Sequence, residues 1–194
     1  VIVSAVRTPV GNFGGSLKGL GAAKIGSIAI KEALNRINLD PAKVDEVVFG
    51  CVLQGGLGQN IARQCSLGAG LPVEVPALTI NKVCGSGLRS VSIAAQFIQN
   101  GDADIIVAGG TENMSDAPMV LDDARWGFRM ASPKTGFGKV KDMLIYDGIW
   151  DVYNSFHMGN TAENVAAQYG LTRDQLDEGA AASQNKAEAA IKAG

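Results

Sequence analysis

The chain has 194 residues, 46% of them hydrophobic, which is enough for one sizeable core and a smaller second unit. Its net charge of −2 gives no reason to expect a nucleic-acid partner, and no apolar run is long enough to cross a membrane. Three cysteines without metal-like spacing, and the lack of a leader with a basic start and an apolar centre, favour the reducing cytoplasm.

The first part of the chain alternates strand-like and helix-like segments. Residues 1–6 are apolar and predict a strand, whereas residues 22–38 carry apolar side chains at helical spacing. A second strand is expected over residues 44–53 and a short helix over residues 60–67. The glycine-rich turns do not complete a G-x-G-x-x-G pattern, so a dinucleotide-binding fold is not expected. This alternation predicts an α/β fold with a mostly parallel sheet and helices on both faces.

The middle of the chain predicts a strand, a sharp turn, a helix and a second strand. The β-branched run 75–83 stops at the turn Cys84-Gly85-Ser86-Gly87. From Leu88 the apolar residues recur at helical spacing until Asn100-Gly101, which predicts a helix that is buried between layers. The run 104–108 is continuously apolar, as in strands that are buried on both faces of a parallel sheet. Cys84 therefore stands where the helix is expected to begin.

The pattern leaves two interpretations of Cys84 open. Backbone N–H groups of the first helical turn face this corner, and the neighbouring glycines let a substrate approach the main chain, which suits a nucleophile. The helix dipole contributes only about 0.3–1 kcal/mol, so such a thiol needs a base from elsewhere in the fold. The alternative is a small buried residue at a helix start. Cys51, in a predicted strand, and Cys65, in a predicted helix, are interpreted as core residues.

Several blocks of the sequence resemble the thiolase family. The turn Asn81-Lys82-Val83-Cys84-Gly85-Ser86-Gly87 resembles the family's nucleophile motif, and residues 108–115 (AGGTENMS) resemble its following strand and turn. Residues 7–13, 58–64 and 157–166 resemble further family blocks, in the family's order and over nearly the whole chain. The resemblance implies a thiolase-like layered α/β fold, of which this chain is the N-terminal half of a biosynthetic member.

The resemblance also implies a division of the chain. Residues 1–115 would form the N-terminal α/β domain that carries the nucleophile, and residues 116–194 part of an inserted loop domain that covers the active site. The activating histidine and a second cysteine, which handles the α-proton, would lie in the second half of the fold, beyond Gly194. Relatives in the family imply a homodimer or a homotetramer.

The activity implied by the resemblance is acyl transfer. Cys84 would take the acetyl group of one acetyl-CoA, and a second acetyl-CoA would attack it to give acetoacetyl-CoA and CoA, with thiolysis as the reverse reaction. Its backbone N–H, at the helix start, would form part of an oxyanion hole. No cofactor is expected beyond the coenzyme A thioesters themselves. The open alternatives are a degradative 3-ketoacyl-CoA thiolase, a ketoacyl synthase, and a non-catalytic thiolase-like protein that binds acyl-CoA or lipid.

His157 is the only histidine and also has two interpretations. A lone histidine beside aromatic residues is commonly a packed or exposed side chain. The resemblance instead implies that His157 and Met158 contact the pantetheine arm of the substrate and that Ile149 lines the same wall. Asn160 or Thr161 is expected to cap the next helix.

The last part of the chain gives two further expectations. A capping box at Thr172 is expected to open the final helix. The segment 116–155 has no clean period and carries cations that are interpreted as solvated, with steering of an anionic substrate as the alternative. These cations are Arg125, Arg129, Lys134, Lys139 and Lys141.

Overall fold

The computed structural model describes residues 1–122, 124–127 and 139–194. The chain forms two compact units, Val1–Gly148 and Ile149–Gly194. The division predicted after residue 115 separates a nucleophile-bearing domain from a covering loop domain, and it stays a prediction.

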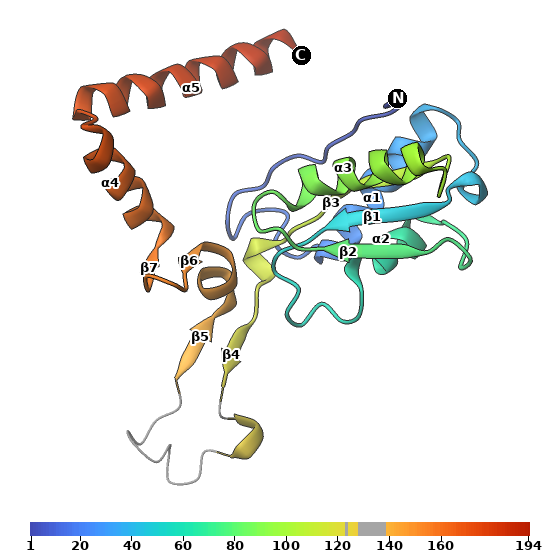
Figure 1. The fold of residues 1–194 in the computed structure, drawn as a ribbon, viewed down its shortest axis with the longest axis horizontal. Helices are drawn as coiled ribbons and strands as arrows, with labels where there is room; N and C mark the ends of the chain where they lie inside the picture. Colours follow the sequence, from blue (N-terminus) through green and yellow to red (C-terminus); the bar gives the residue numbers. More distant parts are fainter. Residues whose placement is uncertain (123, 128–138) are drawn as a thin grey trace. The chain divides into compact units, whose positions relative to one another are not determined.

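A parallel three-stranded sheet organises the first unit (Figure 1). The central strand β1 (Glu46–Gly50) pairs with β2 (Ala77–Ile80) on one side and with β3 (Ile106–Gly110) on the other. Val47 and Val48 of β1 are both completely buried although successive side chains of a strand point to opposite faces. Burial on both faces is typical of a parallel sheet that is covered by helices, so the predicted α/β arrangement is confirmed.

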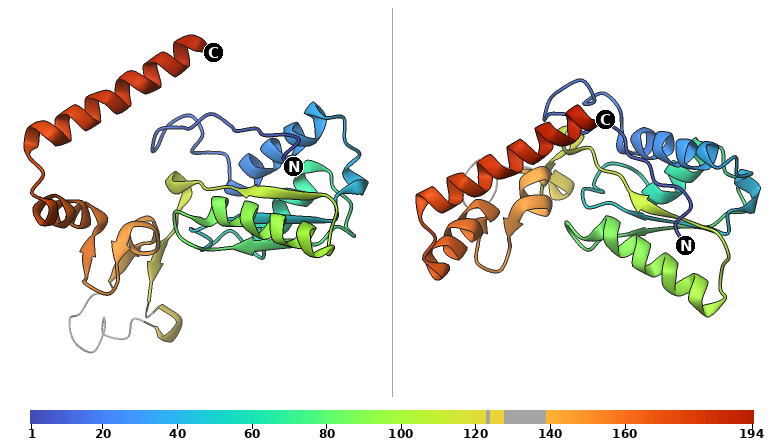
Figure 2. Two further views of the ribbon diagram at one scale, coloured as in Figure 1. Left: turned by 45° about the horizontal axis from the view of Figure 1, so that its top comes forward. Right: turned by 90° about the horizontal axis from the view of Figure 1, so that it is seen from above.

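Helices cover both faces of this sheet, as Figure 2 shows. Helices α1 (Ala22–Arg36) and α2 (Ile61–Ala69) pack against each other on one face, and α3 (Ser86–Asn100) lies on the other. A Cβ atom at Gly26 of α1 would collide with the Cys65 sulfur, so the close approach of α1 and α2 requires a glycine there.

The main core fills the space between the sheet and the α1/α2 layer. Its members include Phe49 of β1, Ile30 of α1 and Ile61 of α2. Cys51 and Cys65 belong to the same core and are 1% and 0% exposed, which confirms their interpretation as core residues.

Among the residues that the structure describes, partners cover only one side of α3. Ser86, Ser90 and Ala94 are buried, whereas Leu88, Val91 and Ile98 are 79%, 39% and 41% exposed. These last three residues form an apolar row, called here the outer row of α3, because their spacing of three and seven residues puts them on one helix face. The sequence predicts a helix buried between two layers, and the described chain supplies one of those layers.

Residues 1–6 do not form the predicted strand. Their side chains suit a strand, but within the described part of the chain no strand edge pairs with them, and Val1, Ile2 and Val3 are exposed. A β-strand exists only with a hydrogen-bonding neighbour, so composition alone gave the wrong prediction here. The following loop is fixed instead by residues after β3: Gly14 N–H donates to Ser115 Oγ at 2.9 Å, and Asn113 Nδ2 donates to the Leu20 carbonyl at 2.6 Å.

The rest of the first unit consists of short elements. The 3₁₀ turns are Pro41–Lys43, Met114–Asp116 and Ala124–Trp126, the strands β4 (Met119–Leu121) and β5 (Val140–Asp142) pair antiparallel, and a π-helical segment, η4, covers Leu144–Ile149. Among the predicted cations, Arg129 and Lys134 lie outside the described residues. Lys141 pairs with Asp122, and its Nζ lies 4.5 Å from the centroid of the Tyr146 ring. Lys141 therefore has partners within the protein.

The second unit is a small hairpin followed by two helices. Strands β6 (Trp150–Asp151) and β7 (Phe156–His157) pair antiparallel, and α4 (Met158–Tyr169) and α5 (Arg173–Ala193) follow. The capping box at Thr172 is confirmed: its hydroxyl accepts from Gln175 N–H, and the Gln175 side chain accepts from Thr172 N–H. None of the helices in the described ranges combines the length and the apolar character that a membrane span needs.

Candidate active site

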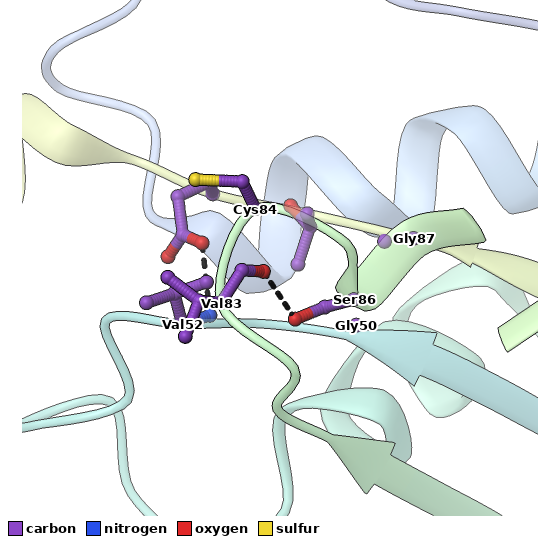
Figure 3. Close-up of a pocket in the computed structure, with 9 residues that line it drawn as sticks. Gly50, Val52, Val83, Cys84, Ser86 and Gly87 are labelled. Carbon is purple, nitrogen blue, oxygen red and sulfur yellow. Dashed lines mark hydrogen bonds between the residues drawn. The ribbon is translucent and has the colours of Figure 1, made fainter. Parts of the chain in front are cut away.

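An open hollow of about 380 Å³ lies where the three parallel strands end (Figure 3). It is lined by residues that follow or terminate the strands, namely Gly50, Val52, Val83, Cys84, Ser86, Gly87, Gly110, Thr111 and Glu112. The carboxyl ends of parallel strands meet at one edge of the sheet, which is the usual place for ligands in open α/β folds. The structure thus puts Cys84 at the edge where chemistry is expected.

A strained turn between β2 and α3 carries Cys84. The preceding residue, Val83, has φ +48°, a conformation that costs a β-branched residue about 1–3 kcal/mol. Hydrogen bonds hold it there: Val83 N–H donates to Asn81 Oδ1 at 2.8 Å, and the Val83 carbonyl accepts from Ser86 Oγ at 2.6 Å. A sharp, strained strand-to-helix turn is one way in which enzymes expose a nucleophile at the top of a sheet.

Helix α3 begins at Ser86, inside the predicted turn 84–87 and two residues before the predicted helical period starts at Leu88. Its N-cap is Gly85, so Cys84 lies directly before the cap, at the corner between strand and helix. The Arg89 N–H donates to the Gly85 carbonyl at 2.9 Å, which is the first bond of the helix. The N–H of Gly87, which lines the hollow, therefore has no acceptor within the helix.

The three cysteines differ sharply in access. Cys84 is exposed, whereas Cys51 and Cys65 are buried. Burial raises the pKa of both buried thiols to about 12, and the nearby Glu112 carboxylate adds to the effect on the pKa of Cys51. At neutral pH these two thiols are protonated as well as inaccessible. Among the cysteines of the chain, Cys84 alone offers its sulfur to a substrate.

The second unit brings the other three predicted site residues together. Trp150 pairs with His157 across the β6–β7 hairpin, and Ile149 and Met158 flank this pair, as the last residue of η4 and the first residue of α4. His157 is exposed, Met158 is 40% exposed and Ile149 is half-buried. The structure therefore supports a common location for Ile149, His157 and Met158.

His157 also has a structural role that the sequence did not predict. It is the N-cap of α4, and its Nδ1 accepts a hydrogen bond from Gly159 N–H at 2.9 Å. The predicted caps, Asn160 and Thr161, lie inside the helix, so that prediction is wrong. A ring nitrogen that accepts a hydrogen bond carries no proton, which leaves Nε2–H as the donor available to a ligand.

The hairpin that carries His157 is fixed by its turn. Asp151 accepts hydrogen bonds from the Asn154 side chain at 2.7 Å and from the Tyr153 N–H at 2.8 Å. The bonds from Asn154 lower the pKa of Asp151, because they stabilise the ionised carboxylate. Asp151 thus stays charged at neutral pH and keeps the turn closed.

Comparison with known proteins identifies the family. The model of the thiolase N-terminal domain matches residues 1–194, the whole chain. This chain belongs to the thiolase family. The predicted family and the predicted thiolase-like fold are both confirmed.

Individual relatives are similar over the same range. The chain is 56% identical over 194 residues to an acetyl-CoA acetyltransferase of Syntrophomonas wolfei and 59% identical to one of Cupriavidus necator; each match covers 100% of the chain and 48% of the relative. A probable acetyl-CoA acyltransferase of Staphylococcus aureus is 48% identical over 187 residues, which are 96% of the chain and 46% of that relative. The thiolase chain thus spans about half the length of the curated relatives it matches.

Glu112 is a residue of the thiolase hollow whose role the sequence did not predict. Its carboxylate accepts hydrogen bonds from the N–H groups of Val52 and Leu53, each at 2.9 Å, and the Cys51 sulfur lies 3.5 Å from Oε1. Glu112 thereby joins the segment after β3 to the segment after β1. A signal was present in the sequence, because a polar residue directly after an apolar strand of a parallel sheet lies at the functional edge.

Gly50 forms the floor beneath the thiolase turn. A Cβ atom at this position would lie 2.7 Å from the Cβ of Ser86 and 2.8 Å from the backbone nitrogen of Gly87. The start of α3 therefore rests directly on the end of β1, which requires a glycine in the strand. This contact fixes the height of the Cys84 turn above the sheet.

Proposed function

We propose that the full-length protein is an acetyl-CoA C-acetyltransferase. It would condense two acetyl-CoA molecules to acetoacetyl-CoA and CoA, and it would catalyse the reverse thiolysis. The observation that carries the proposal is the exposed Cys84 on a strained turn at the carboxyl edge of a parallel sheet, in a thiolase chain. The relatives named acetyl-CoA acetyltransferase support the choice of substrate.

The proposed reaction passes through a thioester on Cys84. A base removes the thiol proton, the sulfur attacks the acetyl carbonyl carbon, and the bond from that carbon to the sulfur of CoA breaks. The departing thiolate of CoA takes up a proton. The second acetyl-CoA then loses an α-proton, its α-carbon attacks the acetyl carbon, and the sulfur of Cys84 leaves. The α-proton goes to a second base, and the thiolate of Cys84 takes up a proton. Each half-reaction exchanges one thioester for another bond to the same carbonyl carbon, so no external oxidant or reductant is needed.

The biosynthetic direction is supported by the hairpin of the second unit. It presents an exposed His157 beside Met158 and Ile149, which resembles the pantetheine-contacting segment of short-chain biosynthetic thiolases. We further propose a cytoplasmic homodimer or homotetramer. The location is supported by three free cysteines, and the oligomeric state by the family resemblance.

Alkylation of the cysteines tests the proposed nucleophile. We expect limiting iodoacetamide at pH 7.5 to label Cys84 of the full-length protein at least about tenfold faster than Cys51 or Cys65, because burial protects these two thiols and keeps them protonated. Peptide mapping by mass spectrometry measures the three rates. Acetyl-CoA added first should protect Cys84 alone. Equal labelling of the three thiols would exclude the assignment.

Substitution of His157 tests the proposed binding role. In the full-length protein, His157→Ala should raise KM several-fold and spare most of kcat, as expected when uniform binding is lost. His157→Asn is the matched control, because asparagine is a strong N-cap and can replace the bond to Gly159 N–H while removing the Nε2–H donor. If only the alanine variant raised KM, the residue would act through the cap of α4. A fall in kcat of about 10²–10⁴ in both variants would make His157 an acid–base catalyst instead.

A further inference from the structure

We propose that Ser86 is a positioning residue that holds Cys84 in its reactive orientation. The proposal rests on the proposed function, in which Cys84 is the nucleophile. Ser86 is 4% exposed and lines the same hollow as Cys84. Figure 3 shows it beneath the turn, with its hydroxyl directed to the main chain of Val83.

The hydroxyl of Ser86 closes the turn around Cys84. It accepts a hydrogen bond from Lys82 N–H at 2.8 Å and donates one to the Val83 carbonyl at 2.6 Å. One side chain after the nucleophile thus binds the peptide group that leads into Lys82 and the one that leads into Cys84. These partners belong to the turn and not to α3, so the hydroxyl acts on the path of residues 82–84 and not on the stability of the helix.

The turn needs such a constraint because of Val83. A valine with φ +48° is strained, and without restraint it relaxes toward the extended region, which would rotate the peptide that leads into Cys84. Asn81 restrains Val83 from the other side, since its Oδ1 accepts from Val83 N–H at 2.8 Å. Asn81 and Ser86 therefore hold the two ends of one strained residue. We call these two side chains the turn clamp.

The backbone hydrogen bonds of the turn do not replace the hydroxyl. The Ser86 N–H also donates to the Val83 carbonyl, but at the longer distance of 3.1 Å. This backbone bond cannot satisfy Lys82 N–H, which loses its acceptor, Ser86 Oγ, when the hydroxyl is removed. The orientation of Cys84 consequently depends on the turn clamp, in which the Ser86 hydroxyl is the buried arm.

The test compares three variants of the full-length protein. Ser86→Ala removes one arm of the clamp, and Asn81→Ala removes the other at an exposed position that does not endanger the core. Ser27→Ala is the matched control: Ser27 is also 4% exposed and also donates to a backbone carbonyl, that of Ala23 at 2.7 Å, but it lies on α1 away from the hollow. Two readouts are measured: hydrogen–deuterium exchange of the peptide 80–89, and the single-turnover rate of acetylation of Cys84 by acetyl-CoA.

Both clamp variants should speed amide exchange in this peptide and slow acetylation of Cys84 by about ten- to a hundredfold, because small misplacement of a reacting atom has effects of this size. The steady-state loss should fall on kcat, with KM changed by less than about twofold, and Ser27→Ala should change neither readout.

Unchanged exchange in Ser86→Ala would refute the clamp, and faster exchange with an unchanged acetylation rate would refute its positioning role. Should Ser86→Ala fail to fold, Asn81→Ala decides by the same criteria. Absence of acetyl-Cys84 in the wild type would refute the proposed function instead, and iodoacetamide labelling of Cys84 would then replace acetylation as the readout of its orientation.

Discussion

Cys84→Ala should abolish acyl transfer by the full-length protein, with kcat lowered at least about 10³-fold in both the condensation and the thiolysis direction. The expected effect is large because the covalent intermediate needs the sulfur, and no other thiol of this chain can replace it: Cys51 and Cys65 are 1% and 0% exposed. Cys84 is exposed, so its loss removes little packing, and the variant should unfold at nearly the same temperature as the wild type.

Cys65→Ala is the matched control for this prediction. It makes the same chemical change in the core between α1, α2 and the sheet, where it should cost about 1 kcal/mol of stability and leave kcat within about twofold. Thermal unfolding and steady-state assays of both variants separate loss of chemistry from loss of structure. A Cys84→Ala protein with wild-type turnover would require a different nucleophile and would refute the proposed mechanism.

The sequence was most informative where local signals and tertiary packing agree. The apolar spacing of residues 22–38 and the glycine after Asn100 predicted α1 and the end of α3 closely, because both reflect contacts within one helix and its own buried face. The capping box at Thr172 was predicted from residues three apart, and the structure confirms both of its hydrogen bonds.

The sequence was least informative where a residue's role depends on distant parts of the chain. Residues 1–6 have strand-forming side chains but no strand beside them within the described residues, and no local signal reports that. Glu112 gains its role from N–H groups about sixty positions earlier in the chain, those of Val52 and Leu53. The cap formed by His157 was missed because an imidazole in this position is unusual, whereas Asn160 and Thr161 matched the common preference.

The same distinction explains why Cys84 could be predicted only as a candidate. The glycines and the change of period located the turn, but access, strain and hydrogen bonding decide whether a thiol there is reactive. In the structure Cys84 is exposed, Val83 carries the strain, and Asn81 and Ser86 supply the hydrogen bonds. These three properties make Cys84 a much better candidate than the pattern did.

The chain Val1–Gly194 expressed by itself should therefore show no turnover. Its single histidine, His157, is assigned to substrate binding, and Cys51 and Cys65 are buried with pKa values of about 12. None of these three residues is therefore suited to activate Cys84 or to accept the α-proton. The outer row of α3 is exposed in this chain, so we also expect association at micromolar concentration.

Assays of acetoacetyl-CoA thiolysis and of acetyl-CoA condensation, with size-exclusion chromatography, test this last prediction against the full-length protein as the positive control. Circular dichroism of the 194-residue chain establishes that it is folded, so that inactivity can be attributed to missing groups.

Adding the remaining half of the protein as a separate chain should restore activity if the two halves associate through the outer row of α3. Turnover by Val1–Gly194 near that of the full-length protein, lost in Cys84→Ala, would show that this half carries its own base, and Glu112 would be the first candidate because it lines the same hollow as Cys84.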